Sequence, residues 1–339
     1  MLQNLPLARA GVNRDAAART SPEDLARLRA HPRARWFLAR PDGVAVAGGS
    51  GLDLHPMTAL DGLGLREMRA SLDATPDAGD PWADVDARTG APAHPGNGAD
   101  WVLGYLGADG DVPYFAAFVT GDDVPRPIED AARGAQIVGL RDIGGIDDRG
   151  AGLAVAAVAL AAWHARNPRC PRCGAPTVPI QAGWVRECTA DGSLHFPRTD
   201  PAVIMAITDA DDRVLLGHAA TFPARRWSCL AGFVEAGESA EAAVRRETAE
   251  ETEVAVGEVE YLGSQPWPFP CSLMLAYRGR TVDSRPVPRP DGVEMLDARF
   301  FSRADLRAAV LAGEVVLPPG ASIARAILTH WYGAELPQR

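Results

Sequence analysis

The stretch GFVEAGESAEAAVRRETAEETEV, residues 232–254, joins a glycine-bearing apolar start to seven glutamates within 23 positions. Ser239 is a favourable N-cap residue and predicts that a helix begins just after it. At about 100° per residue, three small or apolar residues share one face and predict its buried side: Ala240, Val244 and Thr248. Glu247 and Glu251 fall in nearly the same sector, so the pattern directs two carboxylates toward the interior.

Two carboxylates on the buried side of a helix are unfavourable unless something compensates their charge. Burial removes hydration, side chains four residues apart repel each other, and the C-terminal end of a helix disfavours negative charge. A divalent cation would relieve all three effects, and oxygen ligands favour Mg²⁺ or Mn²⁺ over zinc. A solvated acidic helix is the alternative interpretation. It accounts for a run of charge, but not for this particular spacing.

The stretch matches the pattern G-x5-E-x7-R-E-x2-E-E. This pattern fixes six residue identities, and a random sequence would match it at about 1 in 10⁷ starting positions. The matching residues are Gly232, Glu238, Arg246, Glu247, Glu250 and Glu251. This pattern resembles the Nudix box, the signature of hydrolases that cleave a nucleoside diphosphate linked to another group. The resemblance implies an α/β/α sandwich with a mixed sheet, in which the box forms a loop, a helix and a loop.

The resemblance also implies roles for the residues of the box. Three glutamates would hold the metals and carry the catalysis: Glu247, Glu250 and Glu251. Arg246 and Glu238 would support the loop before the helix. Two positions depart from the family pattern, since Thr248 replaces an aliphatic residue and Glu253 replaces a glycine where positive φ is common. We expect the second departure to affect the end of the helix without removing a metal ligand.

A second stretch, SQPWPFPCS at 264–272, begins 13 residues after Glu251. Its three prolines hold the chain extended and rigid, while Trp267 and Phe269 offer flat apolar surfaces. A proline-rich loop that covers the core is the alternative interpretation. The stretch resembles the SQPWPFPxS motif of the NADH pyrophosphatase branch of Nudix hydrolases. That resemblance implies substrate contacts from Gln265, Pro266, Trp267, Pro268, Phe269, Pro270, Cys271 and Ser272.

Other landmarks of that branch are present along the chain. The resemblance implies that Phe233 and Phe196 pack against a base. It implies further metal-binding positions at Ala231 and at Glu294, in DGVEMLDARFF. It also implies substrate contacts at Ala324, in LPPGASIAR (317–325), and at Arg141, which stands 29 residues before Cys170.

The cysteine pattern predicts a small metal-binding segment. Cys170-Pro-Arg-Cys173 and Cys188 resemble the zinc ribbon of the same branch, in which a second CxxC pair completes a tetrahedral site. Here the fourth position holds Asp191, and His195 four residues later is a substitute ligand. A relic ribbon held by packing alone is the alternative interpretation. The remaining cysteines, Cys229 and Cys271, are interpreted as small apolar residues of the hydrolase domain.

Composition sets the remaining expectations. A net charge of −10 argues against avid, sequence-independent binding of nucleic acid. Five cysteines without an export signal indicate a reducing compartment, and we expect a cytoplasmic protein. The longest apolar run, residues 151–163, is too short to span a bilayer, which needs about 20 residues, and is predicted to be a buried helix.

The expected fold class is α/β in the broad, mixed α+β sense, with three regions. Residues 1–148 would form an N-terminal Nudix-like α+β domain, residues 149–198 a linking helix and the ribbon, and residues 199–339 the catalytic domain. Short apolar stretches predict strands in the N-terminal region at 34–39, 42–49, 100–107 and 112–119, and residues 59–72 could form a helix. Further strands are predicted at 201–208, 213–219, 272–282 and 298–302, and two helices close the chain.

The predicted function is hydrolysis of NAD(H) at its pyrophosphate, giving nicotinamide mononucleotide and AMP with Mg²⁺ or Mn²⁺. One alternative is the same chemistry on NAD-capped RNA, and another is a non-catalytic Nudix module that senses a nucleotide. The expected partner is a dinucleotide rather than a membrane, and the family suggests a homodimer. The box alone does not distinguish NADH from ADP-ribose, because metals and phosphates suffice for the chemistry.

Overall fold

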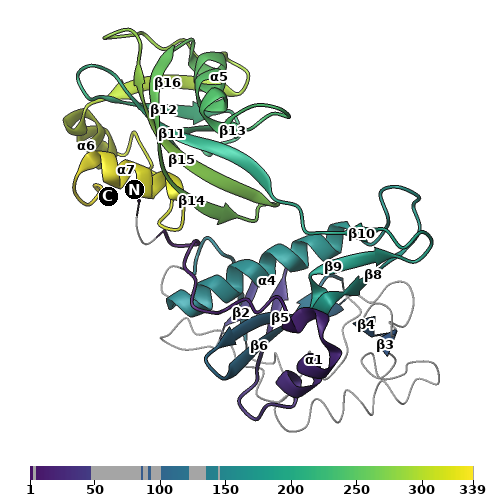
Figure 1. The fold of residues 1–339 in the computed structure, drawn as a ribbon. Helices are drawn as coiled ribbons and strands as arrows, with labels where there is room; N and C mark the ends of the chain where they lie inside the picture. The colour runs from purple at the N-terminus through teal and green to yellow at the C-terminus, as the bar shows by residue number, and fades with distance from the viewer. Residues whose placement is uncertain are drawn as a thin grey trace. The chain divides into compact units, whose positions relative to one another are not determined.

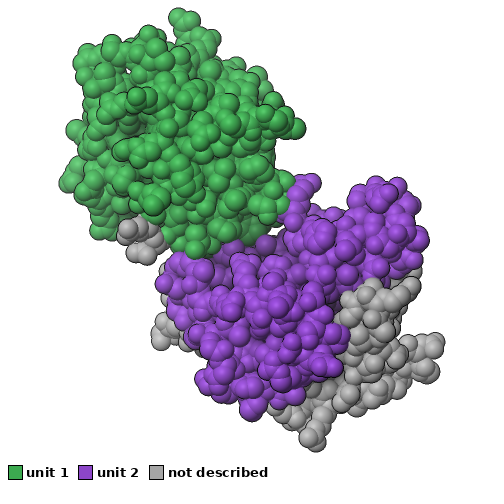
Figure 2. Space-filling model, viewed as in Figure 1, with its two compact units in different colours: residues 1–8, 199–339 green, residues 9–198 purple. Residues whose placement is uncertain are grey.

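The computed structural model describes residues 1–2, 5–46, 85–86, 91–92, 101–121, 135–143 and 146–338. The chain divides into two compact units, one made of residues 9–198 and the other of residues 1–8 together with 199–339 (Figures 1 and 2). Residues 59–72, where a helix is predicted, lie outside the described residues. No helix among the described residues is long and apolar enough to cross a membrane.

The unit of residues 9–198 contains a five-stranded sheet in the order β5-β6-β1-β2-β7. Its strands are β1 (Arg35–Arg40), β2 (Gly43–Val46), β5 (Trp101–Asp109), β6 (Val112–Val119) and β7 (Gln136–Val138). Its helices are α1 (Pro22–Arg29) and α4 (Asp148–Arg166), with a 3-10 turn at Ala18–Thr20. Leu25 of α1 joins a core with Trp36 and Leu38 of β1. The four strands predicted in this region are confirmed within the described residues, and residues 47–49 of the second one lie outside them.

The apolar run 151–163 forms the middle of α4, and the expectation of a buried helix is confirmed. Most of its residues are buried, and it packs against the same sheet, next to β1 and β6. After α4 comes a small antiparallel sheet in the order β10-β9-β8, which forms the ribbon. Its strands are β8 (Thr177–Ile180), β9 (Val185–Cys188) and β10 (Leu194–His195), with a 3-10 turn at Gln181–Gly183. The short strands β3 (Val85–Asp86) and β4 (Ala91–Pro92) pair with each other.

The other unit is built on a mixed six-stranded sheet in the order β14-β15-β11-β12-β16, with β13 also paired to β11. β11 and β15 run parallel, and the other pairs are antiparallel. The strands are β11 (Asp200–Thr208), β12 (Val214–Ala219), β13 (Leu230–Phe233), β14 (Val256–Trp267), β15 (Ser272–Thr281) and β16 (Met295–Phe301). The helices are α5 (Ala240–Thr252), α6 (Arg303–Ala312) and α7 (Ile323–Tyr332). All four strands and both closing helices predicted here are confirmed.

Helices cover both faces of this sheet, as Figure 1 shows. Successive residues of β11 point to opposite faces, as in any strand. Val203, Met205 and Ile207 therefore pack with Val244 of α5, while Ile204 and Ala206 belong to the core under α6 and α7. The α/β/α sandwich with a mixed sheet is confirmed.

The first eight residues belong to the sandwich rather than to the chain that follows them. The Leu2 amide donates to the Leu262 carbonyl of β14 at 2.7 Å, and Leu5 is buried in the core under α6 and α7. This segment closes one side of β14, a long strand that the sequence patterns did not reveal.

Candidate active site

The box helix α5 begins at the expected residue. The Ser239 side chain accepts a hydrogen bond from the Ala242 amide, as an N-cap does. Val244 and Thr248 are fully buried, Ala240 is half-buried, and Ala243 completes the apolar face. The Thr248 hydroxyl donates to the Val244 carbonyl at 2.7 Å. Because its hydroxyl is satisfied within the helix, threonine can replace the aliphatic residue of the family pattern.

Arg246 holds the box together. Its guanidinium donates to both oxygens of Glu238, each at 2.9 Å, and to the Phe233 carbonyl at 2.9 Å. It also donates to Glu247 Oε1 and Glu250 Oε2, each at 2.9 Å. The pair with Arg246 lowers the pKa of Glu238 below its ordinary value. One cation therefore fixes the loop before the helix to two of the predicted metal ligands.

The Glu247 carboxylate lies directly against β13, where the chain has Gly232. A Cβ at position 232 would come within 1.9 Å of Glu247 Cδ and within 2.1 Å of Glu247 Oε1. No side chain fits in that space, so the glycine of the box is required for the carboxylate to lie there. Burial raises the pKa of Glu247, and the adjacent Arg246 offsets part of that effect.

Glu251 is the carboxyl group of the cluster whose ionisation is most strongly disfavoured. Burial, and after it the charges of Glu247 and Glu294, raise the pKa of Glu251 to about 8. Its Oε2 atom is buried and has no hydrogen-bond partner among the described residues. A buried carboxylate oxygen without a donor is costly, and a divalent cation is the group that would satisfy it. The donor set and this orphaned oxygen fit Mg²⁺ or Mn²⁺, which Glu247, Glu250, Glu251 and Glu294 would hold.

The unfolding free energy of Glu251→Gln tests whether ionisation of Glu251 destabilises the folded protein. In the wild type, the stability that comes from keeping Glu251 protonated is complete below its ordinary pKa of 4.5 and is lost as the pH rises to about 8. Glutamine stays neutral throughout. Without divalent metal, Glu251→Gln should therefore match the wild type near pH 4.5 and exceed it by roughly 1 kcal/mol or more above pH 8.

Saturating Mn²⁺ should reverse that order, because only the wild type gains the full free energy of metal binding. Urea unfolding at pH 5 and at pH 8.5, with and without Mn²⁺, measures all four differences. If the variant is no more stable than the wild type at pH 8.5 without metal, ionisation of Glu251 does not destabilise the folded protein.

The helix ends at Glu253, the second departure from the family pattern. Glu253 has φ 56° and ψ 19°, a left-handed conformation that favours glycine and costs other residues about 1–2 kcal/mol. Its amide still donates to the Ala249 carbonyl at 2.8 Å, so the helix closes normally. The positive φ expected at this position is present, and the metal ligands are unaffected.

The glutamates line a cavity of about 640 Å³ at the end of the sheet. Predicted site residues that share this cavity are Ala231, Gly232, Phe233, Arg246, Glu247, Glu250, Glu251, Ser272 and Glu294. The Phe233 ring is about half exposed, and Ala231 lies on β13, where it can offer only main-chain atoms to a metal. Other lining residues were not singled out from the sequence: Ala202, Glu235, Met274 and Asp291.

The SQPWPFPCS segment leaves β14, turns and enters β15, so that its last residue, Ser272, reaches the cavity. Trp267 and Phe269 are half-buried and meet edge to face, with ring centroids 4.8 Å apart. The Phe269–Pro270 peptide is cis. Pro268 is buried, while Pro266 is half-buried and Pro270 is exposed. Cys271 is half-buried, and its thiol donates to Asp200 Oδ2 at 3.3 Å. This contact is more polar than expected for a residue that was interpreted as a small apolar one.

Gln265 anchors this segment to the core through hydrogen bonds at both ends of its side chain. It is fully buried, and its amide nitrogen donates to the Ala321 carbonyl at 2.9 Å while its oxygen accepts from the Leu7 amide at 3.1 Å. Both ends of the side chain are therefore used to join three distant parts of the unit. Ala324, on α7, is also buried, at 2% exposure. These two predicted substrate contacts lie in the core.

Arg141 and Phe196 belong to the unit of residues 9–198, and both are exposed. Cys229 is buried, and burial raises the pKa of its thiol to about 12, as expected of a small core residue.

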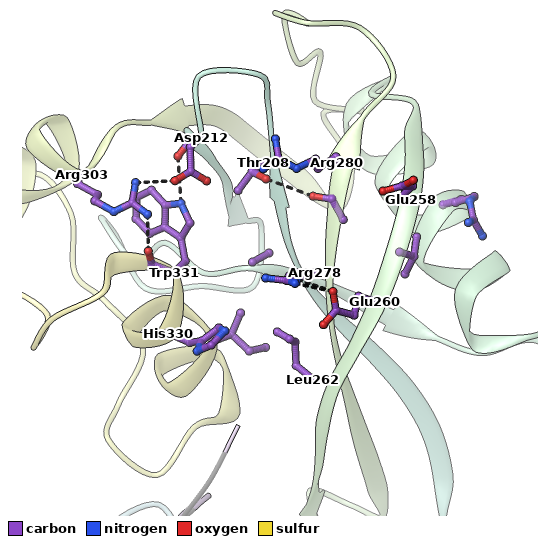
Figure 3. Close-up of a pocket in the computed structure, with 15 residues that line it drawn as sticks. Thr208, Asp212, Glu258, Glu260, Leu262, Arg278, Arg280, Arg303, His330 and Trp331 are labelled. Carbon is purple, nitrogen blue, oxygen red and sulfur yellow. Dashed lines mark hydrogen bonds and ion pairs between the residues drawn. The ribbon is translucent and has the colours of Figure 1, made fainter. Parts of the chain in front are cut away.

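A larger cavity of about 760 Å³ lies beside β14, β15 and α7 in the sandwich (Figure 3). Arg278 and Glu260 form a cross-strand ion pair at its centre, and Arg303 pairs with Asp212 at 2.8 Å beside the Trp331 ring. None of the predicted site residues lines it. Among the described residues, no buried carboxylate oxygen without a hydrogen-bond partner lines this cavity, whereas Glu251 lines the smaller one, so the chemistry is assigned to the smaller cavity.

The ribbon cysteines form two equivalent turns. The amides of Gly174 and Gly192, both at positive φ, donate to the carbonyls of Cys170 and Cys188 at 2.9 and 3.0 Å. Each turn therefore presents two side chains, at its first and fourth positions. The ligand atoms of Cys170, Cys173, Cys188 and Asp191 lie within 4.8 Å of one another.

Asp191 rather than His195 takes part in this cluster. Its Oδ1 atom accepts hydrogen bonds from the Ser193 amide at 2.9 Å and the Ser193 hydroxyl at 2.5 Å. The Ser193 hydrogen bonds lower the pKa of Asp191 to about 2. His195 contacts Ser193 instead, with 3.2 Å between Nε2 and Oγ. Three thiols and one ionised carboxylate fit zinc, although four cysteines are the commoner set.

A helix that presents carboxylates to a cavity at the end of the sheet, inside an α/β/α sandwich, defines a hydrolase of the Nudix class. Residues 198–319 match the family model of the NUDIX domain, and residues 165–196 match that of the NADH pyrophosphatase zinc ribbon domain. A protein named NAD-capped RNA hydrolase NudC from Mycobacterium bovis is 43% identical over 219 residues, which cover 62% of this chain and 70% of that protein. The chain belongs to the NADH pyrophosphatase branch of the Nudix hydrolases.

Two further similarities have narrower coverage. The human protein named NAD-capped RNA hydrolase NUDT12 is 37% identical over 198 residues, which cover 55% of this chain and 42% of that protein. A crystal structure of a NUDIX hydrolase from Nitrosomonas europaea superposes with a TM-score of 0.38 at 22% identity, covering 49% of this chain and 94% of that one.

Proposed function

We propose that this enzyme hydrolyses the pyrophosphate of NAD(H), giving nicotinamide mononucleotide and AMP. The observation that carries the proposal is the convergence of two elements on one cavity. The carboxylates of Glu247, Glu250, Glu251 and Glu294 line it, and so does Ser272, the last residue of the SQPWPFPCS segment. The first element suits a diphosphate, and the second is the part of the chain that resembles the NADH-specific branch.

The residues of the cavity divide into three tasks. Glu247, Glu250, Glu251 and Glu294 would hold Mg²⁺ or Mn²⁺, which would supply positive charge for the pyrophosphate oxygens and would lower the pKa of the attacking water. Arg246 keeps Glu247 and Glu250 in place through its hydrogen bonds. Phe233 exposes a flat ring at the cavity and can stack on a base.

A second candidate function is removal of an NAD cap from RNA by the same chemistry. The names of the relatives from Mycobacterium bovis and human favour it, since both are described as NAD-capped RNA hydrolases. The net charge of −10 disfavours RNA as the sole substrate, because a negatively charged protein repels the phosphates of RNA. The free dinucleotide therefore remains a substrate under this second candidate function. A non-catalytic sensing module is disfavoured, because every carboxylate of the metal cluster is in place.

Relative kcat/KM values on NADH, NAD, ADP-ribose and NAD-capped RNA test this assignment. We expect NADH or NAD to exceed ADP-ribose clearly, because only the nicotinamide half distinguishes them. Equal values for NADH and ADP-ribose would contradict the assignment, and a preference for capped RNA over NADH would favour the second candidate.

We further propose that the ribbon binds one zinc ion through Cys170, Cys173, Cys188 and Asp191. Three thiolates and a carboxylate should hold zinc less tightly than four thiolates. Protein purified without chelator should contain up to one zinc per chain, and a strong chelator should remove it readily. Asp191→Cys should slow that loss, measured with a colorimetric zinc indicator, whereas His195→Ala should leave it nearly unchanged.

The opposite outcome would support the relic ribbon. That outcome is the absence of zinc after mild purification, together with an unchanged stability of Cys170→Ser.

We further propose, from family membership, that the protein is a homodimer, which sedimentation tests. From its composition, we propose a cytoplasmic location.

A further inference from the structure

The loop that carries Glu294 is joined to the end of the box helix. The Arg289 amide donates to the Thr252 carbonyl at 2.8 Å, and the Asp291 amide donates to the Glu251 carbonyl at 3.3 Å. The last carbonyls of a helix have no partner inside it, so an outside donor is needed. This loop supplies two. The fourth predicted metal ligand is thereby tied to the helix that carries the other three.

The Asp291 side chain organises the loop itself. Its Oδ1 atom accepts hydrogen bonds from the amides of Val293, Glu294 and Met295 at 3.1, 3.2 and 2.8 Å. Its Oδ2 atom lies 3.2 Å from the Glu294 amide. Gly292 takes φ 72°, and its amide donates to the Met295 carbonyl at 3.0 Å. One carboxylate therefore fixes the main chain on both sides of Glu294.

Asp291 lines the same cavity as the metal-binding glutamates, so it has two possible roles. It could bind a metal directly, or it could place Glu294. The hydrogen bonds favour the second role, because Oδ1 accepts from three main-chain amides around Glu294 and Oδ2 faces the Glu294 amide as well. All three amides donate to Oδ1, so the single amide oxygen of an asparagine can take over these bonds.

We propose that Asp291 is a positioning residue that holds Glu294 in place as a metal ligand. The proposal rests on the proposed function in one respect, which is that the glutamate cluster binds Mg²⁺ or Mn²⁺. Groups that orient metal ligands through hydrogen bonds commonly change metal affinity about 10- to 100-fold when removed. Asp291 should act through Glu294 alone, and its influence should vanish where Glu294 is absent.

Mn²⁺ binding to the full-length protein, measured by titration calorimetry or electron paramagnetic resonance without substrate, gives the test. The variants are Asp291→Asn, Asp291→Ala, Glu294→Ala and the double variant Asp291→Ala/Glu294→Ala. We expect Asp291→Ala and Glu294→Ala each to weaken Mn²⁺ binding about tenfold. Asp291→Asn should stay within about threefold of the wild type, and the double variant should be no more than about twofold weaker than Glu294→Ala.

Three results would overturn the proposal. A loss in Asp291→Asn equal to that in Asp291→Ala would show that the negative charge or direct ligation matters. Additive losses in the double variant would show that Asp291 acts independently of Glu294. An unchanged affinity in Glu294→Ala would remove the ligand that Asp291 is proposed to place. Failure of the wild type to hydrolyse NADH would instead contradict the proposed function and leave the binding pattern intact.

Discussion

Replacing Glu247 by glutamine is expected to reduce NADH hydrolysis more than a hundredfold while the protein stays folded. Glu247 lies against Gly232 and within hydrogen-bonding distance of Arg246, at the centre of the carboxylate cluster. Glutamine has nearly the same size, so the space beside β13 remains filled. It removes one negative charge from the proposed metal site, where a bound metal would supply several kcal/mol of transition-state stabilisation.

The measurement is kcat/KM on NADH with saturating Mg²⁺ or Mn²⁺. Glu241→Gln is a matched control, because Glu241 is exposed in the first turn of the same helix and does not line the cavity. It should retain nearly the full rate. If Glu247→Gln keeps more than a tenth of the wild-type rate, the assignment of the metal site is wrong.

The second large effect is expected at Trp267, which we predict determines selectivity. Trp267→Ala should lower kcat/KM for NADH tenfold or more, and should affect a small diphosphate ester without nicotinamide much less. Its ring packs edge to face with Phe269 in a segment anchored by the buried Gln265. A segment held rigid in advance loses little entropy on binding, so its contacts contribute efficiently to affinity.

The ratio of the two losses is the informative quantity, because general loosening of the loop would affect both substrates. Tyr261→Ala is a suitable control, since Tyr261 is a partly exposed aromatic residue on the same strand β14. It should change neither value by more than about twofold. Equal losses on both substrates in Trp267→Ala would mean that the segment serves the fold rather than recognition of nicotinamide.

Periodicity and spacing were sufficient to predict the box helix. A polar cap at Ser239 and a buried stripe through Val244 and Thr248 are local features, and both are present. The strands predicted on either side of residues 209–212 were predictable for the same reason, because β11 alternates between two apolar faces. Each of these elements is determined by residues that are close to one another in the sequence.

Features that depend on distant pairing could not be predicted in the same way. Nothing near Gln265 indicates that its amide joins residues 7 and 321, or that residues 1–8 belong with 199–339. Asp291 was missed because its bonds go to main-chain amides, which carry no residue-specific signal. The turn geometry of the ribbon similarly favours Asp191 over His195, a choice that the sequence left open.

Identification of the products tests the central claim most directly. NADH incubated with the wild-type protein and Mn²⁺ should give reduced nicotinamide mononucleotide and AMP in equal amounts, resolved by chromatography and by phosphorus NMR. Glu247→Gln should give neither above background. Release of free nicotinamide with ADP-ribose would mean that a glycosidic bond is cleaved, and it would contradict the assignment of these glutamates to hydrolysis of the pyrophosphate.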